Sequence, residues 1–174
     1  MMNANHPIRP MISSDIADFH AAFAAQGWDK PLSVLEGYYA GQQAGEHQVF
    51  VATVDGEIAG YAVLIPQSRG GHFATGIPEI CDFIVLMKHQ RKGIGDAIMN
   101  AAEAAASAFS DTVALGVGLH SGYGAAQRIY AKRGYIPDGS GVWYQGKPLA
   151  PYAPCINDDD LVLYMSKRLE RREG

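Results

Sequence analysis

Residues 90–95 read Gln90-Arg91-Lys92-Gly93-Ile94-Gly95, and the segments on either side of this stretch decide which fold it belongs to. Upstream, residues 80–87 form an apolar run with the length and the branched and aromatic content of a buried strand. Downstream, residues 96–109 are rich in alanine and carry Ile98, Met99 and Ala102 at helical spacing, which predicts a helix. The stretch is therefore expected to be a glycine turn between a strand and a helix.

A glycine turn that leads into a helix is a favourable place for a phosphate group. The first backbone N–H groups of a helix have no partner within the helix and lie at the positive end of its dipole. Because glycine has no side chain, a phosphate can approach these N–H groups closely. We therefore expect the chain to bind a phosphorylated cofactor at this turn.

The spacing of the glycines argues against the two common nucleotide-binding motifs. The dinucleotide fingerprint requires a third glycine where this chain has Ile98. It also requires an acidic residue about 20 positions further on, where residues 114–116 are Ala-Leu-Gly. The nearest approach to a Walker loop, residues 141–148, ends in Pro148 in place of the Ser or Thr that would hold magnesium.

Two motifs, taken in order, resemble the acyl-CoA-binding signature of the GNAT N-acetyltransferase superfamily. The first is the pattern Gln/Arg-x-x-Gly-x-Gly/Ala, which begins here at Gln90 directly after a strand. The second is residues 126–135, which look like the closing helix and turn of that family, Ala-x-x-x-Tyr-x-x-x-Gly-(Phe/Tyr), with Tyr130 at the tyrosine position. A strand-like segment, residues 113–119, lies between them.

The resemblance covers nearly the whole chain and implies an α+β GNAT fold. In that fold a mixed, mostly antiparallel central sheet of about seven strands has helices on both faces, so we expect residues 1–174 to form a single acetyltransferase domain. Asp15 and Ser33 are expected to cap helices that run through Ala25 and Gln42. Residues 55–56, Asp-Gly, predict a two-residue hairpin. Further strands are expected at residues 8–11, 48–54, 57–65 and 161–167.

Residues 137–160 are rich in glycine, proline and aromatic residues. We expect this segment to be too long and too irregular for a bare hairpin turn. Loops of that length are usually functional or disordered.

The family resemblance implies that the chain transfers an acetyl group from acetyl-CoA to a primary amine by direct attack. An alkylamine has a pKa of roughly 10.4, so at neutral pH it must lose a proton before it attacks. A carboxylate can take that proton directly or through a water molecule. A tyrosine phenol, with a pKa of about 10, can donate a proton to the departing thiolate.

Two residues are the expected catalytic pair. The resemblance places Tyr130 beside the sulfur of CoA as the general acid, although a tyrosine that packs in the core would give the same pattern. Glu79 lies eleven residues before Gln90 and matches the glutamate at the start of the cofactor strand in histone-acetylating relatives, so it is the candidate base. The alternative for Glu79 is a solvated carboxylate at the end of a strand.

Three other residues compete for the role of base. Asp82 is expected on the opposite face of the strand from Glu79. A charge inside so apolar a strand is costly unless it is paired, so Asp82 has either a partner or a function. His72 and His120 could also accept a proton, but a single histidine is more often structural or exposed.

The resemblance also implies two sets of backbone contacts with the cofactor. The strand residues would pair with the pantetheine as if it were an added strand, and the backbone N–H groups of the turn would hold the pyrophosphate. Met87 departs from the proline that is usual in relatives, and Tyr123 departs from the asparagine that usually begins the closing helix. No metal is expected. The expected cofactor-binding residues are Val85, Met87, Gln90, Arg91, Lys92, Gly93, Ile94, Gly95, Asp96 and Tyr130.

Composition limits the remaining functions. A net charge of −4 and a pI near 5.8 argue against a general nucleic-acid binder, which would carry a basic face. No run approaches the roughly 18 apolar residues of a membrane span, and the first residues lack the pattern of a signal peptide, so we expect a cytoplasmic protein. Cys81 and Cys155 form no disulfide framework, and Cys81 lies in the strand that is expected to be buried.

The acceptor is left open as a small-molecule or peptide amine. By analogy with the family, its surface would come from residues 28–39, 69–76 and 141–157. The aspartates at 158–160 could attract a cationic amine, or form a solvated turn. The aromatic residues that could line an acceptor pocket are Trp143, Tyr144 and Tyr152.

Two other functions remain as alternatives. One is a GNAT-fold module that binds acyl-CoA for regulation or interaction without turnover. The other is a nucleotide-binding protein of the doubly wound class, which dinucleotide binding unaffected by CoA would support. A homodimer is compatible with the resemblance.

Overall fold

The structure is a computed structural model that describes residues 6–74 and 76–170. The chain divides into two compact units. The first comprises Met1–Ile65 and Cys81–Ala105, and the second comprises Pro66–Ile80 and Ala106–Gly174. The two units are described in turn.

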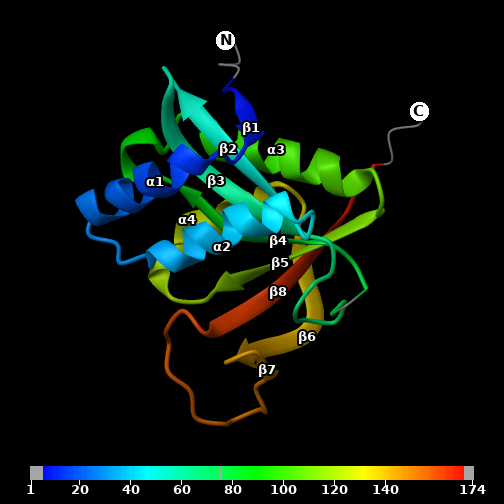
Figure 1. The fold of residues 1–174 in the computed structure, drawn as a ribbon. Coiled ribbons are helices and arrows are strands. Elements are labelled where there is room, and N and C mark those ends of the chain that lie inside the picture. Colours follow the sequence, from blue (N-terminus) through cyan, green and yellow to red (C-terminus); the bar gives the residue numbers. More distant parts are fainter. Residues whose placement is uncertain (1–5, 75, 171–174) are drawn as a thin grey trace. The chain divides into compact units, whose positions relative to one another are not determined.

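The described residues form an α+β fold with eight strands, mostly antiparallel, and four α-helices (Figure 1). This confirms the fold class that the resemblance implies. The eight strands agree with the expected count of about seven, and they include β7 (Lys147–Pro148), a two-residue strand that the sequence pattern does not indicate.

In the first unit the strands follow the order β1-β2-β3-β4. Both β1–β2 and β2–β3 are antiparallel pairs. Asp55 and Gly56 have φ angles of 51° and 84°, as the predicted two-residue hairpin requires. The strands of this unit are β1 (Ile8–Pro10), β2 (Gln48–Val54), β3 (Glu57–Ile65) and the part of β4 (Glu79–Val85) that begins at Cys81.

Helices cover both faces of the β3 strand. On one face, Phe19 and Phe23 of α1 (Ser13–Ala25) contact the Tyr61 ring, with centroid distances of 4.9 and 6.3 Å. Helix α2 (Leu32–Gln43) packs against α1 and adds the buried Leu35 to the same core. On the other face, Gly60 lies against Ile98 of α3 (Ile94–Ser107), as the resemblance implies for helices on both faces.

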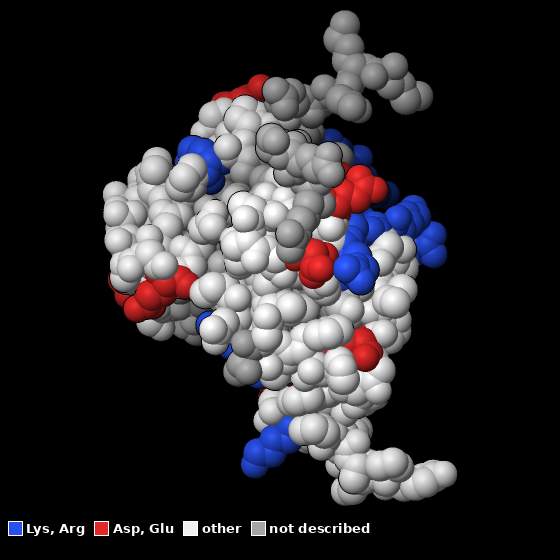
Figure 2. All heavy atoms as spheres, turned by 90° about the vertical axis from the view of Figure 1, so that its right-hand side faces the viewer, with Lys and Arg blue, Asp and Glu red and all other residues white. Residues whose placement is uncertain are grey.

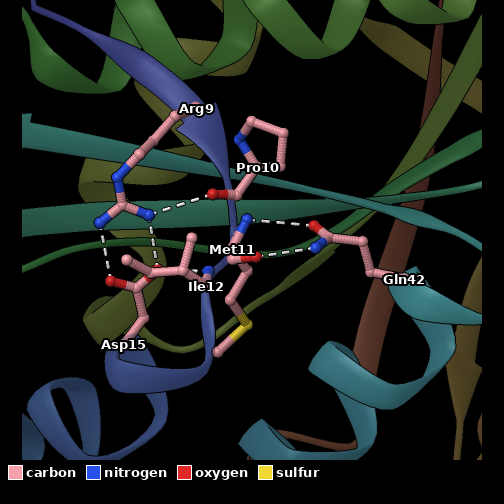
Figure 3. A network of polar contacts seen from close by, with 6 residues as sticks. All are labelled: Arg9, Pro10, Met11, Ile12, Asp15 and Gln42. Carbon is pink, nitrogen blue, oxygen red and sulfur yellow. Dashed lines mark hydrogen bonds and ion pairs between the residues drawn. The ribbon is translucent and has the colours of Figure 1, made fainter.

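The N-cap expected at Asp15 is wrong by three residues, because Ile12 occupies that position and Asp15 acts from inside the first turn. The helix begins at Ser13, and the Asp15 carboxylate accepts a hydrogen bond from the Ile12 N–H at 2.9 Å (Figure 3). Arg9 binds both oxygens of Asp15, at 2.6 and 2.7 Å, so the buried carboxylate is neutralised. Helix α2 likewise starts one residue before Ser33, and the Ser33 side chain does not cap it.

A glutamine side chain closes the same corner of the first unit. The Gln42 carboxamide accepts a hydrogen bond from the Met11 N–H at 3.1 Å and donates one to the Met11 carbonyl at 2.8 Å (Figure 3). Since Met11 is buried and follows the last residue of β1, both of its backbone groups need a partner that no strand residue provides. The Gln42 carboxamide satisfies both backbone groups of Met11, one with its oxygen and one with its nitrogen.

The cofactor strand and helix lie close to the predicted ranges. The strand expected over residues 80–87 runs Glu79–Val85, and a short 3₁₀ turn, η1 (Met87–His89), follows it. The helix expected over residues 96–109 is α3, which starts and ends two residues earlier. Cys81, expected to be buried, is only half-buried.

In the second unit the strand order is β4-β5-β8-β6-β7. The start of β4 pairs in parallel with β5, with Glu79 opposite Ala114, and all other pairs are antiparallel. Helix α4 (Gly124–Lys132) follows a 3₁₀ turn, η2 (Ser121–Tyr123). The longer strands of this unit are β5 (Thr112–Gly118), β6 (Ile136–Tyr144) and β8 (Leu161–Arg168).

The irregular segment predicted for residues 137–160 is partly a strand. Its first residues belong to β6, whose register against β8 shifts between Pro137 and Val142. Within this bulge, Gly139 and Gly141 have φ angles of 86° and 79°, a conformation that favours glycine. The glycines that make the sequence look like a loop are thus the residues that allow the strand to bulge.

Charged side chains are spread in small groups over the surface. On the face shown in Figure 2, acidic and basic side chains lie close to one another and are separated by broad uncharged areas. No helix of the described residues has the length and apolar character needed to cross a membrane.

Candidate active site

The glycine turn predicted to bind phosphate leads into the start of α3. Arg91 and Gly93 have φ angles of 60° and 81°, so the chain reverses sharply before the helix begins. The Ala97 N–H donates to the Gly93 carbonyl at 3.1 Å, which closes the first helical turn. Around the position that a Gly93 Cβ would take, the nearest atom of the described residues beyond its chain neighbours is His6 Nε2 at 4.0 Å, so these residues leave the approach to this backbone open.

The charges around the turn suit an anion. Arg91 and Lys92 are exposed, and Lys92 Nζ donates to the Lys88 carbonyl at 2.9 Å. His6 Nε2 lies 2.7 Å from the Lys92 carbonyl oxygen and ties the start of the described chain to the turn. An open backbone at the start of a 14-residue helix, next to two cations, fits the pyrophosphate of a nucleotide cofactor.

At the end of β4, one edge of the strand faces β3 and the other edge faces away from β3. The Leu86 N–H donates to the Ala59 carbonyl of β3 at 2.9 Å. Because successive residues of an extended chain direct their backbone groups to opposite sides, the Val85 carbonyl and the Met87 N–H lie on the other edge. These are the two residues expected to pair with pantetheine, and the Met87 side chain is 52% exposed.

Glu79, the candidate base, is buried rather than solvated. It is 6% exposed, and its Oε2 accepts a hydrogen bond from the Arg69 N–H at 2.9 Å. The same oxygen lies 3.1 Å from Ser68 Oγ, whose single proton is shared between Glu79 and the Gly70 carbonyl at 2.9 Å. The alternative of a solvated strand-end carboxylate is therefore wrong. Both hydrogen bonds end on Oε2, so Oε1 is the oxygen that the described contacts leave for a proton.

Tyr130, the candidate acid, lies on α4 and is 5% exposed. Its ring lies 5.9 Å from the Tyr135 ring, and its carbonyl accepts a hydrogen bond from the Tyr135 N–H at 3.0 Å. Gly134, with a φ angle of 88°, lets the chain turn at the end of α4 so that the Tyr135 N–H can reach the Tyr130 carbonyl. The closing helix and turn predicted from the sequence thus exist, and they fix the position of the Tyr130 ring in the second unit.

The start of α4 is held by the side chains of Gln127 and Tyr123, of which the sequence analysis singled out only Tyr123. Gln127 Nε2 donates to the Gly118 carbonyl at the end of β5, at 2.9 Å. Tyr123 stands at the N-cap position without a side-chain cap, and its hydroxyl donates to Asp159 Oδ1 at 2.9 Å. A Cβ on Gly118 would lie 2.4 Å from the Tyr123 ring, so only glycine fits there.

His120, one of the competing bases, has a structural role. Its Nδ1 accepts a hydrogen bond from the Gly122 N–H at 3.1 Å, so the proton of the neutral ring is on Nε2, which donates to Asp159 at 2.9 Å. The hydrogen bond from His120 Nε2, and then that from the Tyr123 hydroxyl, lower the pKa of the Asp159 carboxyl. The other histidine considered, His72, is exposed and is held through its backbone N–H by Asp138 at 2.6 Å.

Asp82 has the partner that its burial in an apolar strand predicted. Lys30 Nζ binds its two oxygens at 2.6 and 2.5 Å, and the Tyr61 hydroxyl donates to Oδ2 at 2.7 Å. Burial and the charge of Asp82 raise the pKa of Tyr61, which stays protonated as the donor. Asp82 has a φ angle of 47°, an unusual value for a non-glycine residue in a strand. Both of its oxygens are engaged by Lys30.

The Lys30 ammonium also lies over aromatic rings. It is 5.7 Å from the centroid of Phe23 and 5.6 Å from that of Tyr61. Sequence reasoning indicated that Asp82 needs a partner, but nothing in the local pattern pointed to a lysine 52 positions earlier.

The aromatic residues expected to line an acceptor pocket differ in their surroundings. Trp143 is fixed, because its Nε1 donates to Ser140 Oγ at 2.9 Å and its ring packs against Tyr164 at 5.3 Å. Tyr152 is fully exposed. In the acidic run at 158–160, Asp158 Oδ1 accepts from the Asp160 N–H at 3.0 Å, the pattern of a solvated turn.

The chain resembles solved acetyltransferase structures over nearly its full length. Ard1 from Thermoplasma volcanium has 20% sequence identity and a TM-score of 0.68, with 96% of this chain and 99% of that chain covered. YncA from Salmonella typhimurium, solved with its cofactor acetyl-CoA, has 18% identity and a TM-score of 0.66, with coverage of 98% and 97%. At this level of identity the likeness shows the fold.

A third such structure is a ribosomal-protein-alanine N-acetyltransferase from Brucella melitensis. It has 18% identity and a TM-score of 0.67, with 94% of this chain and 99% of that chain covered. Comparison with curated protein sequences finds no significant match. The sequence profile of the acetyltransferase (GNAT) domain matches residues 45–137, more than half of the chain, and this stretch holds both predicted motifs. The chain therefore belongs to the GNAT acetyltransferase family.

Proposed function

We propose that the protein is an N-acetyltransferase that uses acetyl-CoA to acetylate a primary amine by direct attack. The observation that carries the proposal is the open glycine turn at the start of α3, with Gly93 in a left-handed conformation between two exposed cations and the helix. Family membership supports the use of an acyl-CoA donor. The single acetyltransferase domain expected from the resemblance remains part of this proposal.

Each cofactor-binding residue has a defined task in this proposal. The backbone N–H groups from Arg91 to Asp96 hold the pyrophosphate, and the side chains of Arg91 and Lys92 add positive charge. Val85 and Met87 bind the pantetheine through their backbone groups. The bound acetyl-CoA supplies an activated thioester carbonyl. Gln90, whose Nε2 donates to the Val85 carbonyl at 3.1 Å, shares this acceptor with the pantetheine.

The proton transfers are assigned to two residues of the second unit. Glu79 accepts a proton from the amine, directly or through a water molecule, with its Oε1 atom. The new bond joins the amine nitrogen to the carbonyl carbon, and the carbon–sulfur bond breaks. Tyr130 donates a proton to the leaving thiolate. General acid and base groups of this kind contribute roughly 10²- to 10⁴-fold each to the rate.

The acceptor in this proposal is a primary amine of a small molecule or a peptide. The Brucella melitensis relative is named for an alanine of a ribosomal protein, which makes a protein N-terminus one amine to test. Polyamines, amino acids and aminoglycoside-type antibiotics complete the panel of amines.

The first experiment measures thermal unfolding with and without acetyl-CoA. A ligand present at 100 times its Kd stabilises the folded state by about 2.7 kcal/mol, which for this length raises Tm by roughly 5 to 10 °C. Release of free thiol is then measured with the panel of amines, in the wild type and in Tyr130→Phe. A shift with acetyl-CoA and none with NAD, followed by amine-dependent thiol release, is the expected result.

Two outcomes would contradict the proposal. The absence of any shift at saturating acetyl-CoA would overturn cofactor binding. A shift without thiol release from any amine, and unchanged by Tyr130→Phe, would favour the alternative of a module that binds acyl-CoA without turnover.

A further inference from the structure

The outer edge of β4 has the hydrogen-bonding pattern of an incomplete sheet. Leu86 is extended, with φ −58° and ψ 141°, and its N–H is used by β3. The carbonyl before it and the N–H after it therefore point to the side away from β3. One residue of a parallel strand, or one amide-containing chain, would satisfy both by donating to the Val85 carbonyl and accepting from the Met87 N–H.

Two glutamine side chains already occupy these groups. Gln90 Nε2 donates to the Val85 carbonyl at 3.1 Å. Gln26 Oε1, at the C-cap position of α1, accepts from the Met87 N–H at 3.1 Å. Each carboxamide provides one of the two hydrogen bonds that an added strand would make. Together they imitate a single strand residue.

The oxygen of the Gln26 carboxamide has a hydrogen-bond partner, but its nitrogen does not among the described residues. Its Oε1 is bonded to Met87, whereas its Nε2 is buried and finds no hydrogen-bond partner among the described residues. Gln42, by contrast, uses both ends of its carboxamide on Met11 (Figure 3). Because a buried donor without a partner is costly, the unsatisfied Nε2 makes Gln26 easier to release than Gln42, whose release breaks two hydrogen bonds.

We propose that Gln26 is a displaceable cap on the Met87 N–H, and that an amide of acetyl-CoA takes its place when the cofactor binds. This inference rests on the proposed function, since it takes acetyl-CoA to be the ligand of this edge. It adds a residue of α1 that controls cofactor affinity without belonging to either sequence motif. Met87 makes the cap possible, because a proline at this position would have no N–H to donate to Gln26.

The cap reduces the apparent affinity for the cofactor. Only molecules in which Gln26 has released Met87 can accept the amide, so the measured Kd equals the intrinsic Kd divided by the fraction released. A single hydrogen bond of ordinary strength keeps the released fraction low enough to weaken binding by roughly 2- to 10-fold. Removal of the cap should therefore tighten acetyl-CoA binding by that factor.

The test compares Gln26→Met with Gln42→Met. Methionine keeps the length of the side chain and removes the carboxamide in both variants. Acetyl-CoA binding is measured by titration calorimetry, and exchange of the Met87 amide hydrogen is measured by NMR without ligand. Gln26→Met should bind acetyl-CoA roughly 2- to 10-fold more tightly and exchange its Met87 amide faster. Gln42→Met should lower Tm while its Kd for acetyl-CoA stays within about twofold of the wild type.

Gln90 is left unchanged in this test, because it also belongs to the motif on which the proposed function depends. If the wild type binds acetyl-CoA and Gln26→Met binds it equally or more weakly, the inference about the cap is overturned and the proposed function stands. If the wild type does not bind acetyl-CoA, the proposed function is overturned and the cap has no ligand to control. Unchanged exchange of the Met87 amide in Gln26→Met would also contradict the cap.

Discussion

Replacement of Glu79 by glutamine separates the chemistry of this side chain from its place in the fold. Glutamine has the same shape, and its Oε1 can accept the hydrogen bonds that Ser68 Oγ and the Arg69 N–H now donate at 3.1 and 2.9 Å. A carboxamide is not basic, however, so it cannot accept the proton of the incoming amine. The variant should therefore fold and bind cofactor but turn over slowly.

The two effects differ enough in size to be told apart. A hydrogen bond to a charged acceptor contributes about 1.5–3 kcal/mol and a neutral one about 0.5–1.5, so two weakened bonds cost roughly 2 kcal/mol. This is well within the stability of a typical domain, about 5–15 kcal/mol. Loss of a general base lowers kcat by roughly 10²- to 10⁴-fold, equivalent to about 2.7–5.4 kcal/mol in the barrier.

The assay follows thiol release at saturating acetyl-CoA and amine, with Kd for acetyl-CoA and Tm measured on the same samples. Glu46→Gln is the control, because Glu46 is exposed and the same chemical change there should leave all three values unaltered. A kcat of Glu79→Gln within about threefold of the wild type, with unchanged Kd, would refute the role of Glu79 as the base and leave it as a structural carboxylate.

Three further predictions concern stability. Gly60→Ala should cost about 1–3 kcal/mol in urea unfolding, because the new Cβ would lie 2.4 Å from the Ile84 carbonyl oxygen, a backbone atom that cannot turn aside. Lys30→Met should cost about 2–4 kcal/mol, somewhat less than the 3–5 of a fully buried pair, since the side chains of Lys30 and Asp82 are 18% and 19% exposed. Burial, and then the charges of neighbouring lysines, lower the pKa of His89 in the folded state, so the unfolded chain binds more protons. Stability should therefore be complete above about pH 6.5 and should fall as the pH drops below it, by up to roughly 1.4 kcal/mol per pH unit.

Each of these predictions has a control within the chain. Gly37→Ala places a methyl group where no atom lies within 4 Å, so it should not destabilise the fold. The double variant Lys30→Met with Asp82→Asn should recover most of the loss, and failure to recover it would mean that the pair itself is not the cause. The slope of Tm below pH 6.5 should become shallower in His89→Phe, and an unchanged slope would assign the pH dependence to another group.

Local patterns in the sequence predicted the elements of the fold with small errors. The hairpin at Asp55 and Gly56, the strand before the glycine turn and the helix after it depend on neighbouring residues only, and their observed bounds differ by two residues or fewer. The strand β6 was read as a loop because its bulge contains the glycines that usually mark loops. Local sequence patterns cannot distinguish a loop from a strand with a glycine-containing bulge.

Side-chain contacts between residues far apart in the chain could not be predicted from the sequence. Asp82 was predicted to need a partner, but its partner Lys30 lies in the connection between α1 and α2. Nothing about Gln26 or Gln42 distinguishes them from other polar helix residues until their carboxamides are seen on the backbone of another element. The hydrogen-bond partners of such side chains depend on how the chain folds and not on the local sequence pattern.

The hydrogen-bond partners of Asp15, Asp82 and Glu79 bear on which of these three carboxylates suits the proposed role of base. Asp15 is bound through both oxygens by Arg9, and Asp82 through both oxygens by Lys30. To accept a substrate proton, either would have to give up a cation in a poorly solvated site, which would leave that cation without its counter-charge. Glu79 is bound only at Oε2, by a hydroxyl and a backbone N–H among the described residues. In the proposed mechanism Glu79 can therefore take the amine proton at Oε1 without giving up a paired cation.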